Sequence, residues 1–163
     1  MNTKKLTALS ASVALAMVLS FLETLIPPLA AVPGVKIGLA NIVTVFLLYT
    51  YGWREAGSVS IIRVCLSAML FGSAVSFIYS ASGALLSFFG MLLIKRLSIS
   101  QELSVSVTGG VLHNAGQIIC ASLIMENAGI AIYLPPLIIS GTVSGIAVGI
   151  AAALVIKKLH HIV

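Results

Sequence analysis

The chain has 163 residues, of which 60% are hydrophobic and only 8% are charged, with a formal net charge of +5. Soluble domains carry about 25% charged residues, so this composition excludes a water-soluble fold. The mean hydropathy of +1.17 comes from long uncharged runs separated by a few ionisable residues. We therefore expect an all-α, polytopic membrane protein that forms one integral membrane domain over residues 1–163.

Composition also argues against several chemistries. All four acidic residues are scattered Glu, so the paired carboxylates of Mg²⁺ or glycosidase sites are missing. Cys65 and Cys120 lie far apart, without the spacing of a zinc or redox site. The basic residues are dispersed, which argues against a nucleic-acid partner. P-loop and common hydrolase motifs are absent from the sequence. We expect no catalytic residue, no metal and no cofactor.

Six apolar runs are long enough to be membrane spans, which take about 20 helical residues with a range of roughly 17–25. They are 6–26, 37–53, 56–72, 75–94, 103–126 and 134–156.

The basic residues support this count, because Lys and Arg gather in short cytoplasmic loops. With the N-terminus inside, Lys36 falls outside and Arg63 falls within a span. The other seven lie on the cytoplasmic side: Lys4, Lys5, Arg54, Lys95, Arg96, Lys157 and Lys158. We predict six helices in the cytoplasmic membrane, with both termini in the cytoplasm.

Polar residues cluster where the first run ends on the outer side. Glu23 lies near the end of that run, Lys36 in the Pro-rich loop 27–36, and Asn41 near the start of the second run. A Pro-Gly pair and three prolines exclude helix from the loop. Lys36 opposes the inside bias, so either it meets an anionic group there or it and Glu23 are solvated interfacial charges.

Arg63 lies near the middle of the third run, with Ser60 and Ser67 on the same helical face. A charge at the bilayer centre costs a few kcal/mol unless it faces protein or water. Arg63 therefore binds a substrate carboxylate or phosphate, or ties the bundle together by bonding backbone carbonyls or Glu, or snorkels toward one membrane surface.

The fifth run carries a second polar set. Gly110, His113, Asn114 and Gln117 share one side of a helix, because their offsets are three, four and seven. These neutral donors and acceptors suit a polar, uncharged ring or head group. The alternative is hydrogen bonding between helices, worth about 1 kcal/mol per contact.

Small residues spaced by four mark two faces where helix backbones approach closely. Both faces either pack within the bundle or dock another membrane subunit. The first face is Ala8, Ser12 and Ala16; the second is Gly141, Gly145, Gly149 and Ala153.

Several segments resemble a small membrane family known as Gx transporters or heptaprenyl diphosphate synthase component I. Residues 33–42 read PGVKIGLANI, 51–56 read YGWREA, and 109–117 read GGVLHNAGQ, with Arg63 between them. That family in turn resembles the S components of energy-coupling factor (ECF) transporters. The resemblance implies six helices, a substrate held toward the outer side under the loop 27–36, and small residues of the first helix docked on a coupling subunit driven by two ATPases. Here Ala8, Ser12 and Ala16 would take that role.

Two functional hypotheses follow. The first is the substrate-binding membrane subunit of an importer for a vitamin-like or quinone- or isoprenoid-related molecule. The second is a non-catalytic membrane subunit or anchor of an isoprenoid, quinone or extracellular electron-transfer assembly. Prenyl diphosphate synthesis needs aspartate-rich Mg²⁺ sites that a chain without Asp cannot build. The candidate substrate-binding residues are Glu23, Lys36, Asn41, Arg63, His113, Asn114 and Gln117.

Overall fold

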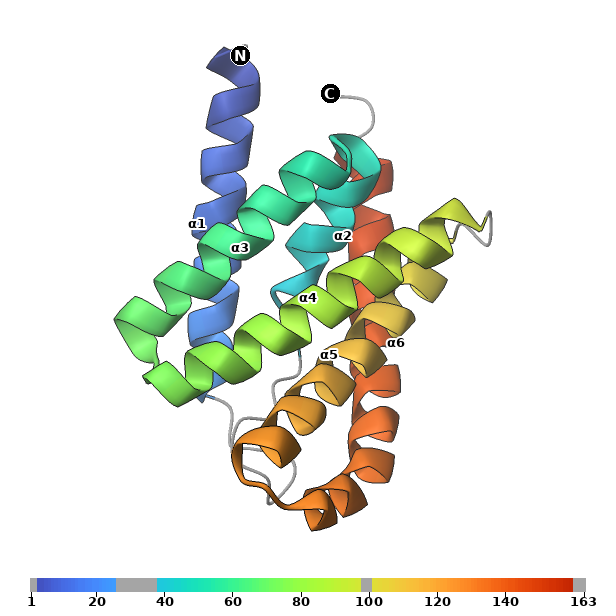
Figure 1. Ribbon diagram of the computed structural model, residues 1–163. Coiled ribbons are helices and arrows are strands. Elements are labelled where there is room, and N and C mark those ends of the chain that lie inside the picture. Colours follow the sequence, from blue (N-terminus) through green and yellow to red (C-terminus); the bar gives the residue numbers. More distant parts are fainter. Residues whose placement is uncertain (1–2, 26–37, 98–100, 160–163) are drawn as a thin grey trace.

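The computed structural model describes residues 3–25, 38–97 and 101–159, and in these parts it is helical without strands (Figure 1). The elements in chain order are α1 (Thr3–Leu25), α2 (Asn41–Thr50), α3 (Trp53–Phe71), α4 (Ala74–Arg96), α5 (Glu102–Ile124), the 3₁₀ helix η1 (Ala128–Tyr133) and α6 (Leu134–Leu159). The all-α class is confirmed, and each predicted run overlaps one α-helix.

Four of the helical segments are long and apolar enough to cross a membrane: α1, α4, α5, and the continuous stretch Ala128–Lys158 of η1 and α6. Their length and composition are those of a multi-pass membrane protein. The helix α3 has 19 residues but carries Arg54, Glu55 and Arg63, and it is not among the four.

The helix α2 is shorter than the run 37–53 that hydropathy marks as a span. It has 10 residues, which at 1.5 Å per residue reach about 15 Å, half of a hydrocarbon core of about 30 Å. Gly38 and Gly52, with φ of 84° and 109°, lie before and after it. Val45 and Leu47 are fully buried, and α2 packs on α1, α3, α5 and α6. A helix that is apolar on all sides belongs at the centre of a bundle.

The helices α4, α5 and α6 pack at close range through glycines. A Cβ atom at Gly110 of α5 would lie 2.4 Å from the carbonyl oxygen of Gly141 in α6. One at Gly145 would lie 2.6 Å from the Cα of Val107, and one at Gly83 of α4 would lie 2.7 Å from the carbonyl oxygen of His113. The small residues of α6 thus face α5 within the chain itself.

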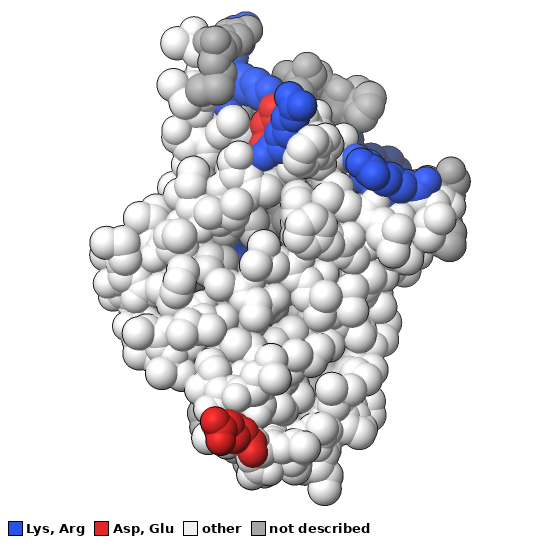
Figure 2. All heavy atoms as spheres, viewed as in Figure 1, with Lys and Arg blue, Asp and Glu red and all other residues white. Residues whose placement is uncertain are grey.

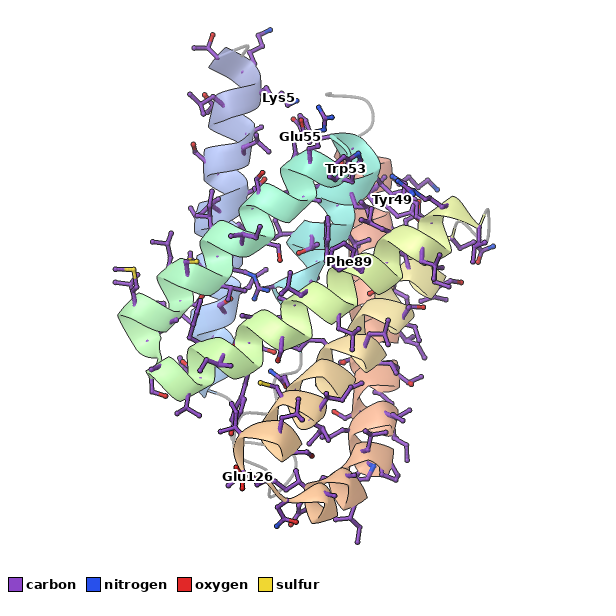
Figure 3. The ribbon with its side chains drawn as sticks, in the orientation of Figure 1. Lys5, Tyr49, Trp53, Glu55, Phe89 and Glu126 are labelled. Carbon is purple, nitrogen blue, oxygen red and sulfur yellow. The ribbon has the colours of Figure 1, made fainter. Side chains whose placement is uncertain are left out.

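Charge gathers at one end of the molecule. Lys and Arg lie near the start of α1 and at the end of α4, and Glu126 lies at the opposite end (Figures 2 and 3). At the basic end, Lys5 of α1 forms a salt bridge with Glu55 in the first turn of α3 (Figure 3). This polarity is the pattern expected when that end faces the cytoplasm.

Candidate functional site

Arg63 lies inside the protein, where α1, α3 and α4 surround a small polar cavity. Its side chain is only 8% exposed. The cavity has a volume of about 70 Å³, several times the roughly 15 Å³ that one water molecule needs. Besides Arg63, hydroxyl groups from three helices line it: Ser20 and Thr24 of α1, Ser67 of α3, and Ser76 and Ser80 of α4.

The guanidinium of Arg63 has more donors than the protein uses. It carries five N–H groups and no acceptor. Its Nη1 donates to the Ser20 hydroxyl over 3.5 Å, and its Nε has no hydrogen-bond partner among the described residues. Burying a charged group costs free energy unless it is paired and hydrogen-bonded. The spare donors are therefore suited to a ligand with acceptor oxygens.

Glu23 supplies a nearby negative charge. It is buried near the end of α1, and its carboxylate attracts the charge of Arg63. The same carboxylate accepts a hydrogen bond from the backbone N–H of Gly38, just ahead of α2. Asn41 follows in the first turn of α2, with its side-chain amide against Gly38. Glu23 and Asn41 thus both adjoin Gly38, whereas Lys36 and the loop 27–36 lie outside the described residues.

The polar residues of α5 lie elsewhere, where α5 packs against α4 and α6. Asn114 donates from Nδ2 to the carbonyl oxygen of Leu137 over 2.9 Å. The Nε2 atoms of Gln117 and His113 are 3.3 Å apart and share a hydrogen bond. All three side chains are buried, and none lines the cavity at Arg63. The structure therefore does not bring the two predicted polar sets into one cavity.

An apolar groove that sequence reasoning missed runs between α3 and α4. Its volume is about 270 Å³. Phe89 of α4 points toward α3 across it (Figure 3). Small residues leave the space open: Gly57 on α3 and Ala81 and Ala84 on α4. The sequence does show these small residues, but it does not show that they face one another. The groove exists only because α3 packs beside α4. The hydroxyls of Ser76 and Ser80, four apart in α4, were missed for the same reason.

The small-residue face of α1 is turned inward. Ser12 and Ala16 are buried and Ala8 is half-buried. Ala16 belongs to the same apolar core as Val43 of α2. The described chain itself therefore covers much of this face, and its docking on a coupling subunit stays a prediction.

The fold and the site define a class of protein: a helical, multi-pass membrane protein with a buried arginine at a hydroxyl-lined cavity. The chain belongs to the family described as heptaprenyl diphosphate synthase component I, whose model matches residues 12–155. This match confirms the family that the sequence motifs indicate. No curated protein and no solved structure matches the chain. Among the described residues, no three His, Cys or acidic side chains are grouped so that they could hold a metal ion.

Proposed function

We propose that this protein is the substrate-binding membrane subunit of a small-molecule importer, similar to an ECF S component. The observation that carries the proposal is the buried guanidinium of Arg63 beside a cavity lined by hydroxyl groups. Intramembrane charges of this kind mark substrate pathways. Six helices in the cytoplasmic membrane, of which α2 is short and enclosed by the others, with the basic end in the cytoplasm, complete the proposed topology.

In this function Arg63 binds a carboxylate or phosphate of the substrate. Hydroxyl groups such as those of Ser20 and Ser67 donate further hydrogen bonds to the same anionic group. The buried carboxylate of Glu23 compensates the charge of the guanidinium when the cavity is empty. No His or carboxylate is among the described residues that line this cavity, so its hydroxyls have no general base there to make them nucleophiles, and we propose binding without catalysis. Because the sequence has no P-loop, the energy for import comes from an ECF-type coupling subunit with its ATPases or from a gradient.

The test is to identify what the purified full-length chain retains from its host membrane. Small molecules extracted from the wild type and from Arg63→Gln are compared by mass spectrometry, with Arg54→Gln as the matched control. Arg54 is an exposed arginine at the start of the same helix. We expect one retained anionic molecule in the wild type and the control, and none in Arg63→Gln. Equal retention in all three proteins would reject Arg63 as the binding residue.

The family description favours a second candidate, a non-catalytic membrane subunit of an isoprenoid-synthesising assembly. The two candidates differ in their partners. Affinity purification of the full-length chain under mild detergent should recover ATPases and a coupling subunit if it imports. Recovery of a soluble prenyl synthase in their place would favour the second candidate.

A further inference from the structure

The polar cavity at Arg63 adjoins the apolar groove between α3 and α4. Val64 lines both spaces. On α4 the two linings alternate along the chain, since Ser76 and Ser80 face the cavity while Phe77 and Ala81, each one residue later, face the groove. A hollow opens between α3 and α4 on the face viewed in Figure 1, and basic atoms are visible at its floor (Figure 2).

The two spaces lie at different heights along α3. The polar cavity extends from Arg63 to Gly72 at the end of α3, away from the basic end of the molecule. The groove extends from Val64 back to Gly57, a rise of about 10 Å toward the basic end. Exposed apolar side chains flank it, among them Ile61 and Leu85. In a bilayer this groove would open sideways to lipid.

We propose that the cavity and the groove form one binding site for an anionic amphiphile. The carboxylate or phosphate head bonds the spare donors of Arg63 and the surrounding hydroxyls, and the hydrocarbon chain lies in the groove between α3 and α4. The ligand enters sideways from the bilayer. This inference rests on the proposed function and names its substrate class.

Charge complementarity is the reason for an anionic head. The Nε of Arg63 is buried and has no hydrogen-bond partner in the described part of the chain, and charge-assisted bonds to anionic oxygens are the strongest it can form. The groove gives the chain its place because its lining is almost wholly apolar: Gly57, Ile61, Val64, Ala84, Leu85 and Phe88. A neutral lipid chain could fill the groove but would leave the Nε of Arg63 without a hydrogen-bond partner in the described part of the chain.

The experiment uses the full-length chain in phosphatidylcholine nanodiscs, with empty nanodiscs to subtract partitioning. Radiolabelled dodecyl phosphate and dodecanoate test the two anionic head groups. Dodecanol is a ligand with the same chain but no charge, and inorganic phosphate is a ligand with the charge but no hydrocarbon chain. Arg63→Gln removes the charged donors, and Ala84→Phe fills the groove. Leu93→Phe adds the same ring on α4 at an exposed position that does not line the groove.

We expect saturable binding of at least one of the two anionic amphiphiles, weakened about tenfold or more by Arg63→Gln. Ala84→Phe should weaken it similarly, whereas Leu93→Phe should leave it unchanged. Dodecanol should show no saturable binding. Inorganic phosphate should bind at least about a hundredfold more weakly than dodecyl phosphate, because burying only three or four CH₂ groups at about 0.8 kcal/mol each already gives that ratio.

Two results would overturn the inference. If neither amphiphile binds above empty nanodiscs, the site does not take this class of ligand. If inorganic phosphate binds as tightly as dodecyl phosphate and Ala84→Phe changes nothing, the groove is not part of the site. The second result would spare the proposed function, because an anion would still bind at Arg63.

Discussion

Glu23 of α1 and Arg63 of α3 are both buried, and the carboxylate of one attracts the guanidinium of the other between two helices that pack together. The pair also connects to α2, because Glu23 accepts the backbone N–H of Gly38. One carboxylate therefore compensates the buried charge and positions the start of the central helix. Only part of the guanidinium is satisfied by this arrangement, which leaves donors for a ligand.

The first prediction concerns this pair. Glu23→Gln should lower the free energy of unfolding by about 3 kcal/mol, because it leaves a buried charge without its counter-charge. The double variant Glu23→Gln/Arg63→Gln should lose less than the sum of the two single variants. Unfolding by SDS titration in mixed micelles measures all four proteins. Strictly additive losses would show that the two groups do not interact.

Helix contact through glycine gives the second prediction. Gly110→Ala places a Cβ 2.4 Å from the carbonyl oxygen of Gly141, so α5 and α6 must separate. We expect a loss of about 1–3 kcal/mol in the free energy of unfolding. The control is Val143→Ala on the exposed side of α6, which should change stability by less than about 0.5 kcal/mol. Equal effects would mean that the close approach is not needed.

The third prediction separates the polar residues of α5 from the ligand. Asn114→Ala removes the hydrogen bond to the Leu137 carbonyl and should cost about 1 kcal/mol of stability. Binding of the retained molecule should stay at the wild-type level, in contrast to Arg63→Gln. Affinity for that molecule and the SDS unfolding midpoint are measured on the same preparation. A loss of binding without a loss of stability would place Asn114 in the site.

A fourth prediction concerns pH. The hydrogen bond from Lys5 lowers the pKa of Glu55 below its ordinary value of 4.5. Glu55 lies at the basic end, before the predicted span 56–72. Because the pKa is lower in the folded state, the stabilisation is present above the ordinary pKa and is lost as pH falls through the lowered one.

Glu55→Gln removes this contribution. As the pH is lowered from 6 through the ordinary pKa of 4.5, the thermal unfolding temperature of this variant should therefore fall less steeply than that of the wild type. Glu126→Gln, at the opposite end, is the matched control and should follow the wild type. Parallel curves for wild type and Glu55→Gln would show that the salt bridge does not contribute to folding stability.

Much of the fold follows from the sequence alone. Long apolar runs have to be helical in a bilayer, because every backbone N–H and C=O needs an internal partner there. That requirement predicts the helices α1, α4, α5 and α6. The cost of a charge in lipid indicates that Arg63 faces protein or water unless it reaches a membrane surface. Family membership was readable from the segment 33–42 and from residues 109–117.

Only the tertiary structure decided which polar residues share a cavity. Hydropathy does not distinguish an apolar residue that faces lipid from one that faces protein, so it did not show that α2 is a short, enclosed helix. Periodicity predicts that His113 and Asn114 share one side of α5, but it does not predict their partners. Because α4 and α6 pack against α5, the Asn114 side chain donates to the Leu137 carbonyl of α6. The crossing of α1, α3 and α4 brought Ser20, Arg63 and Ser80 together, because contacts between distant helices depend on packing rather than on sequence spacing.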